Sequence, residues 1–123
     1  MGIALTDREA DLMRVLWERG ASSVAEVRAA LEDDLAYTTV LTVLRVLESK
    51  GYVGHAEDGR AHRYFAKIEQ KAARVNAVNN LLGKLFHNST ELLLTQLVSD
   101  HKLNNQQVAR VRKLLDKGRP KGK

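Results

Sequence analysis

The chain has 123 residues, a mass of 13.7 kDa and no cysteine. This length suits one domain or two small ones, and it excludes a large enzyme with separate cofactor and substrate domains. The lack of cysteine excludes disulfide scaffolds, zinc–thiolate fingers, iron–sulfur clusters and thiol catalysis. No apolar run approaches the ~20 residues of a membrane span, and the N-terminus lacks the pattern of a signal peptide. We therefore expect a soluble, cytoplasmic protein with no membrane partner.

The positive charge is unevenly distributed along the chain. The formal net charge is +5, yet residues 1–67 contain 9 Lys and Arg against 11 Asp and Glu. Residues 68–123 contain 11 against 4, and residues 38–67 contain 5 against 3. A basic chain suggests nucleic-acid binding, but composition alone is weak evidence for it. The position of the charge relative to an element that reads a DNA groove matters more.

Two helices are predicted at the start of the chain. Thr6 and Glu9 have the spacing of a capping box, and an apolar stripe with helical periodicity follows them. Gly20 is a typical helix stop. Ser23 and Glu26 form a second capping box, which opens a shorter helix.

A third helix is predicted over residues 38–50, ended by Gly51. Val40, Leu44 and Leu47 fall on one side of this helix and form its inner face. The opposite side has little bulk and many hydroxyl groups. It is therefore a candidate contact surface.

The residues after the third helix predict a β-hairpin. Two β-prone runs, 51–57 and 62–67, bracket Asp58-Gly59-Arg60, and Asp-Gly is a strong hairpin signal. Residues 1–67 thus form a predicted winged helix-turn-helix domain that binds DNA.

Residues 68–117 return to a helical pattern, with helix starts at Asn88 or Ser89 and at Asn104 with Gln107. About 50 residues without a sheet make a poor independent core, so we expect these helices to pack against a second copy of the chain. A compact monomer is the alternative. The residues expected at the dimer interface are Val75, Val78, Leu82, Leu85, Phe86, Leu93, Leu97, Val108, Val111, Leu114 and Leu115.

The predicted fold is therefore mainly α with a small β wing. It combines an N-terminal winged helix-turn-helix with a C-terminal three-helix dimerisation region over residues 68–117. Residues 118–123 are expected to be a basic, flexible tail.

No pattern in the sequence indicates catalysis. It has no glycine-rich phosphate loop, no nucleophile elbow and no His-Glu-x-x-His motif. His55 and His62 face each other across the predicted hairpin and are close enough for a metal ion. The simpler interpretation, two half-exposed strand residues, is favoured because no further ligands stand at suitable spacing. We predict no enzyme, no metal and no cofactor.

The outer face of the third helix and the hairpin are the candidate DNA contacts. In a helix-turn-helix the second helix lies in the major groove, where Thr hydroxyls and methyls and an Arg contact base edges. A cationic hairpin tip suits a flanking minor groove or phosphate. Alternatively, the threonines are only a helix cap, and the lysine only complements the helix dipole. The predicted DNA-binding residues are Thr38, Thr39, Thr42, Arg45, Lys50, Arg60 and Arg63.

Residues 35–52 (LAYTTVLTVLRVLESKGY), followed by residues 58–64 (DGRAHRY), resemble the BlaI/MecI/CopY family of bacterial winged-helix repressors. The opening, Leu5-Thr6-x-x-Glu9 followed by Leu16-Trp17, is similar to that family as well. The resemblance covers nearly the whole chain.

The resemblance implies a homodimer that sits on the two half-sites of a palindromic operator and represses antibiotic-resistance genes of the β-lactamase type, or stress genes. It also implies relief of repression by a sensor protease that cuts near Gln96 and Leu97, where this sequence lacks the family's Asn-Phe type of pair. The copper-responsive branch ends in a cysteine-rich motif, which this chain does not have. Two other functions stay open: a winged-helix module that binds proteins, and a ligand-responsive regulator without proteolytic induction.

Overall fold

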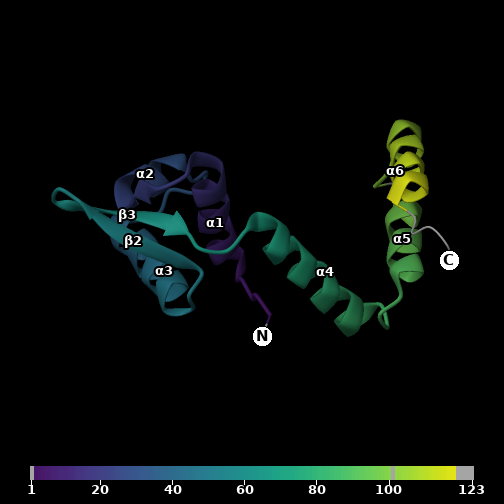
Figure 1. The fold of residues 1–123 in the computed structure, drawn as a ribbon, viewed down its shortest axis with the longest axis horizontal. Helices are drawn as coiled ribbons and strands as arrows, with labels where there is room; N and C mark the ends of the chain where they lie inside the picture. Colours follow the sequence, from purple (N-terminus) through teal and green to yellow (C-terminus); the bar gives the residue numbers. More distant parts are fainter. Residues whose placement is uncertain (1, 101, 119–123) are drawn as a thin grey trace. The chain divides into compact units, whose positions relative to one another are not determined.

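The computed structural model describes residues 2–100 and 102–118, and in these residues the chain forms six helices and three short strands (Figure 1). The elements run α1 (Asp7–Arg19), β1 (Ser22–Ser23), α2 (Val24–Ala30), α3 (Tyr37–Ser49), β2 (Val53–Asp58), β3 (Ala61–Ala66), α4 (Gln70–Leu85), α5 (Thr90–Ser99) and α6 (Asn105–Gly118). This order confirms the predicted fold class, mainly α with a small β wing. No helix within the described residues is long and apolar enough to cross a membrane.

The chain divides into two compact units at the Val78–Asn79 bond, which lies inside α4. The first half of α4 therefore belongs to the N-terminal unit, where the Ile3 N–H donates to Asn76 Oδ1 at 3.1 Å. Ile68 lies before α4 and packs against the N-terminal core, and its carbonyl accepts from Trp17 Nε1 at 2.9 Å. The functional boundary expected between residues 67 and 68 stays a prediction. Residues 119–123 of the expected tail lie outside the described residues.

Both predicted capping boxes are present. The Glu9 N–H donates to Thr6 Oγ1 at 3.2 Å and the Thr6 N–H donates back to Glu9 Oε1 at 2.8 Å. Ser23 and Glu26 form the same reciprocal pair at the start of α2, at 3.1 and 2.9 Å. These bonds satisfy amides that the first helical turn leaves without partners, and they fix where both helices begin.

α3 runs one residue earlier than predicted at both ends, and it stops as the glycine signal indicated. Gly51 has a φ of 83°, and the Tyr52 N–H donates to the Leu47 carbonyl at 3.0 Å. This is the Schellman arrangement, in which glycine reverses the chain without a Cβ clash. The reversal leads the chain directly into β2.

The wing is an antiparallel hairpin of β2 and β3, and β1 pairs with the other edge of β3 to give the strand order β1-β3-β2. Asp58 pairs with Ala61 across a two-residue loop, whose first residue, Gly59, has a φ of 65°. A glycine in this position suits a tight hairpin turn. β1 was not predicted, because two residues are too few to show a strand periodicity. In Figure 1 the hairpin extends away from α1 and α2.

The core of the N-terminal unit lies between α1, α2, α3 and the base of the wing. Its fully buried side chains come from every one of these elements, so the hydrophobic contribution of each helix depends on the others. The residues of this core with the lowest exposure are Leu12, Met13, Val27, Val40, Leu44, Leu47 and Val53.

Helices α4, α5 and α6 are different, because none of their residues is buried. Of the two possible caps for α5, the structure selects Ser89, whose Oγ accepts from the Leu92 N–H at 3.0 Å. Asn104 and Gln107 exchange hydrogen bonds of 2.9 and 2.8 Å at the start of α6, as predicted. The local signals for these helices are thus satisfied while their apolar side chains stay in contact with solvent.

One buried charge joins α1 to the end of α3. The Glu9 carboxylate is 6% exposed and accepts from Lys50 Nζ at 2.8 and 2.9 Å. Burial by itself raises the pKa of Glu9, but the hydrogen bonds from Lys50 and Thr6 outweigh burial, so the pKa lies below its ordinary value of 4.5. The ionised pair therefore stabilises the fold at neutral pH.

We predict that Glu9→Gln lowers the free energy of unfolding at pH 7 by about 1–2 kcal/mol, since it removes the charge that Lys50 neutralises. The lowered pKa of Glu9 means that this contribution is complete above its ordinary value of 4.5 and is lost as the pH falls through the folded value. Urea unfolding should therefore show a gap between wild type and variant that closes in acid. Glu18→Gln, an exposed change on the same helix, is the control. A gap of the same size at neutral and acidic pH would contradict this role.

Candidate nucleic-acid interface

The outer face of α3 is a polar surface held in place by a buried inner face. Thr38, Thr39, Thr42 and Arg45 are exposed, while the interleaved valine and leucines of the inner face are buried. The Thr42 hydroxyl donates to the Thr38 carbonyl at 2.8 Å, which fixes its rotamer and leaves its oxygen able to accept. The structure thus brings these four predicted residues together on one side of one helix.

The threonines at the start of α3 do not cap it. The N-cap position is Ala36, which has no side-chain acceptor, and Thr38 and Thr39 lie within the first turn. α1, α2 and α5 all have side-chain caps, from Thr6, Ser23 and Ser89 respectively, so α3 differs from them. Its first-turn amides and its dipole favour an anion at this end. The interpretation of these threonines as a cap is therefore wrong.

The two arginines of the wing have different surroundings. Arg60 is exposed in the hairpin loop. Arg63 donates from Nη2 to the Ala21 carbonyl at 3.1 Å and forms an ion pair of 3.1 Å with Glu26. Hydrogen bonding from the Ser23 amide, together with the charge of Arg63, lowers the pKa of Glu26. Arg63 therefore ties β3 to the segment before α2, whereas Arg60 is available for a ligand.

Lys50 is also engaged within the fold, through its contact with Glu9. Within residues 2–100 and 102–118, neither Arg45 nor Arg60 takes part in an ion pair. Of the four cationic residues predicted to contact DNA, these two are the ones presented to solvent without a carboxylate partner. The partners of Lys50 and Arg63 are distant in sequence and leave no local pattern. The sequence therefore could not distinguish these two residues from Arg45 and Arg60.

A groove of about 450 Å³ lies between α3 and the wing, and Arg45 and Arg60 both line it. Three other residues line it: Tyr37, His55 and His62. The sequence interpretation missed Tyr37, and it considered the two histidines only as a metal pair, which it did not favour. Tyr37 is 48% exposed at the first position of α3. A signal for it exists in hindsight, since residues 37, 41 and 45 are spaced one helical turn apart.

His55 and His62 do come together across the hairpin, with ring centroids 4.6 Å apart and an angle of 17° between the ring planes. His55 Nδ1 lies 2.6 Å from Glu48 Oε2, so α3 and the wing are joined at this point. Among the residues that the structure describes, no group of three His, Cys, Asp or Glu side chains could hold a metal ion.

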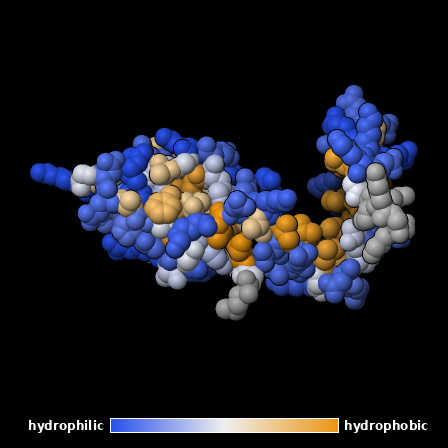
Figure 2. Space-filling model, in the orientation of Figure 1, coloured by the Kyte–Doolittle hydropathy of each residue, from blue (hydrophilic) through white to orange (hydrophobic). Residues whose placement is uncertain are grey.

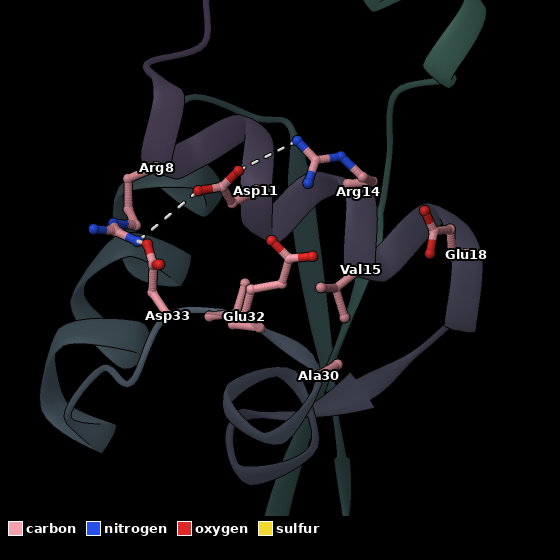
Figure 3. A pocket seen from close by; sticks show the side chains of 9 residues that line it. Arg8, Asp11, Arg14, Val15, Glu18, Ala30, Glu32 and Asp33 are labelled. Atoms are coloured by element: carbon pink, nitrogen blue, oxygen red, sulfur yellow. Dashed lines mark hydrogen bonds and ion pairs between the residues drawn. The ribbon is translucent and has the colours of Figure 1, made fainter.

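A second pocket, of about 240 Å³, lies between α1 and the segment after α2 (Figure 3). Its arginines are occupied by nearby carboxylates: Arg8 Nη1 is 2.7 Å from Asp33 Oδ2, and Arg14 Nη2 is 3.2 Å from Asp11 Oδ1. This pocket is a network of surface ion pairs. The groove beside α3 is therefore the better candidate site.

Comparison with known proteins identifies the family. Residues 5–117 match the family model described as penicillinase repressor. The chain belongs to the penicillinase repressor family. This confirms the resemblance carried by residues 35–52 and 58–64. It also supports the expectation that the chain is not an enzyme, because this family consists of transcriptional repressors.

Two curated relatives of the penicillinase repressor family illustrate the range of similarity. The methicillin resistance regulatory protein MecI of Staphylococcus aureus is 18% identical over 115 residues, which cover 92% of this chain and 94% of MecI. The transcriptional regulator BlaI of Mycobacterium tuberculosis is 48% identical over 63 residues, which cover 49% of this chain and 46% of BlaI. The second match is thus stronger but spans only about half of each protein.

Among solved structures, monomeric BlaI of Bacillus licheniformis in complex with the blaP half-operator matches with a TM-score of 0.51 and 26% identity, covering 58% of this chain and 90% of that one. A MarR family protein of Bacillus stearothermophilus matches with a TM-score of 0.53 over 94% of this chain, at 16% identity. At that identity the second likeness shows a shared fold alone.

The two wing arginines should behave differently when removed. Arg63→Ala should lower Tm by roughly 2–5 °C, because it breaks the contacts to Ala21 and Glu26. Arg60→Ala should leave Tm nearly unchanged, because an exposed loop side chain contributes little to stability. Thermal unfolding followed by circular dichroism measures both. Equal shifts for the two variants would argue against the structural role of Arg63.

Proposed function

We propose that this protein is a transcriptional repressor that binds operator DNA as a homodimer, with α3 in the major groove and the wing on the flanking backbone. The exposed face formed by Thr38, Thr39, Thr42 and Arg45, on a fold of the penicillinase repressor family, carries the proposal. The fold of the DNA-bound BlaI of Bacillus licheniformis supports it.

Each part of the surface has a role in this arrangement. Threonine hydroxyls and methyls contact base edges, including the methyl group of thymine, and Arg45 reaches a guanine edge or a phosphate. The uncapped start of α3 suits a backbone phosphate. Arg60 at the wing tip suits a flanking minor groove or phosphate. Lys50 and Arg63 then act by holding α3 and the wing in position.

The lack of buried side chains in α4, α5 and α6 supports the homodimer. Leu85 is 70% exposed and Leu114 is 67% exposed, which is unusual for large apolar residues unless a partner covers them. Figure 2 shows apolar side chains gathered at the surface of α4. Four more apolar residues of these helices are exposed and join those predicted for the dimer interface: Leu81, Leu92, Leu94 and Val98.

A dimer explains tight binding to a palindrome. Two heads joined in one particle contact successive major grooves, about 34 Å apart, and each raises the effective concentration of the other. A dimer bound over a promoter excludes the polymerase. Antibiotic-resistance genes of the β-lactamase type, or stress genes, are the proposed targets, and the cytoplasm, where such DNA lies, is the proposed location.

A sensor protease remains the proposed partner for induction. Gln96 and Leu97 lie inside α5, where the Gln96 carbonyl accepts from the Asp100 N–H at 3.0 Å. Proteases cut exposed, mobile chain most readily, so cleavage here requires the last turn of α5 to open. The protease would therefore act on a locally unfolded α5.

A protein-binding winged helix would need a continuous apolar patch on α3. Val46 is 41% exposed, but the threonines and Arg45 separate it from Tyr37. The observations therefore favour DNA over a protein partner. A ligand-responsive regulator has no specific support in the described residues.

Fluorescence anisotropy on DNA from upstream of the protein's own gene tests the DNA-binding surface. Arg60→Ala should weaken binding to this duplex and to a scrambled duplex alike, and it should reduce the slope of log K against log salt by about one unit. Thr42→Ala should instead relax discrimination at one operator position, by about 1 kcal/mol or more.

Glu18→Gln, on the exposed side of α1, serves as the control and should bind like wild type. Binding that is unchanged in both Arg60→Ala and Thr42→Ala would remove α3 and the wing from the interface. Weak binding that any duplex competes away would favour the protein-interaction function.

Sedimentation equilibrium tests the homodimer. Wild type should be dimeric at micromolar concentration, and Leu114→Glu should shift it toward monomer because a carboxylate enters an apolar interface. Operator affinity should then fall by about 100-fold, since the two heads no longer bind together. Gln106→Glu, an exposed change in the same helix, alters the charge by the same amount and is the matched control. A wild-type monomer that still binds the full operator tightly would refute the dimer.

A further inference from the structure

His55 and His62 lie on the face of the wing that points toward α3. In the strand register, Val53, His55 and Glu57 alternate along β2, and Tyr64 and His62 lie opposite His55 and Glu57 on β3. Val53 and Tyr64 are buried, at 1% and 3% exposure, so this face is the core-facing side of the sheet. The two histidines continue that side beyond the core, into the groove beside α3.

The groove contains charges of both signs. Arg45 of α3 and Arg60 of the wing loop are positive, and Glu48 of α3 is negative. Glu57 of β2 lies at the edge, with Oε1 3.8 Å from His62 Nε2. Tyr37 and Tyr64 also line the groove, and the residues before and within α2 that line it have no ionisable side chain.

Glu48 is the unexpected member of this set. A carboxylate on the helix proposed to enter DNA repels the phosphate backbone unless a cation neutralises it. The partner within reach is His55, at 2.6 Å, and the two side chains are 34% and 33% exposed. His55 neutralises Glu48 only when the imidazole is protonated.

We propose that His55 and His62 form a proton-dependent binding site for a backbone phosphate of DNA, in the groove between α3 and the wing. The proposal rests on the DNA-binding function proposed above, and it places the sugar-phosphate backbone of one DNA strand in this groove. With both imidazoles neutral, the two arginines and Glu48 give the groove lining a charge of +1. Two imidazolium groups raise it to +3, so binding tightens as the pH falls.

The stacking contact explains why this site responds to the phosphate. Two imidazolium rings 4.6 Å apart repel each other, so both hold a proton only when nearby negative charges compensate. Glu48 and Glu57 each flank one ring, at 2.6 and 3.8 Å, and a bound phosphate adds the further negative charge. DNA binding at this site should therefore be accompanied by proton uptake.

The test is anisotropy at fixed ionic strength, at about pH 6 and about pH 8. Wild type should bind both the upstream duplex and a scrambled duplex roughly 3–10-fold tighter at the lower pH, because one linked proton changes Kd by up to about tenfold per pH unit. His62→Phe keeps a ring against His55 but removes one of the two imidazoles, so it should lose about half of this dependence on a logarithmic scale, and the double variant His55→Phe/His62→Phe should lose all of it. The salt slope of wild type should steepen by about one unit in acid, and that of the double variant His55→Phe/His62→Phe should not.

Two further variants sharpen the result. Glu48→Gln removes the groove carboxylate and should bind more tightly than wild type at about pH 8. His87→Asn removes an exposed imidazole from the turn after α4, where φ is 49° and asparagine is tolerated, and it should keep the wild-type pH dependence.

The outcomes separate this proposal from the DNA-binding function itself. An identical pH dependence in wild type and His62→Phe overturns the phosphate site and leaves DNA binding intact. A pH effect on the upstream duplex alone overturns it as well, because a backbone contact is independent of sequence. A protein that binds neither duplex at either pH overturns the proposed function.

Discussion

The candidate DNA-contacting surface of α3 depends on burial of the opposite side of the helix. Val40, Leu44 and Leu47 are fully buried against α1, α2 and the base of the wing, which fixes the rotation of the helix about its axis. Because side chains on a helix repeat every 3.6 residues, that rotation also determines which residues face outward. The hydroxyl-rich side is exposed as a consequence of the core. A large-to-small change in the core would therefore disturb the proposed DNA-contacting surface without altering any of its residues.

The four cationic residues of α3 and the wing fall into two groups: two form ion pairs within the fold, and two have no carboxylate partner among the described residues. Lys50 binds the buried Glu9 at one end of α3, and Arg63 ties β3 to the start of α2. These contacts position α3 and the wing, between which Arg45 and Arg60 line the groove. His55 contacts Glu48 of α3, so the same histidine that joins the wing to α3 also lines the groove.

The C-terminal helices follow a different principle. Their caps are formed locally by Ser89, Asn104 and Gln107, while their leucines and valines are left exposed. A chain that encodes helices without a core to bury them needs a partner, and in the proposed dimer that partner is an identical chain. Repression and dimerisation are then coupled, since opening any of these helices removes the second head.

The sequence by itself determined the elements whose signals are local. Capping boxes, Gly51 and Gly59 act within a few residues, so the helices, the hairpin and the outer face of α3 could be predicted from neighbouring positions. Only the tertiary structure decided which cations have partners within the fold, because Glu9 lies 41 residues from Lys50 and the Ala21 carbonyl lies 42 residues from Arg63. The same holds for the groove charge, in which Glu48 meets His55 through packing of α3 on the wing. Pairings of this kind depend on how separate elements pack, and no short sequence pattern encodes them.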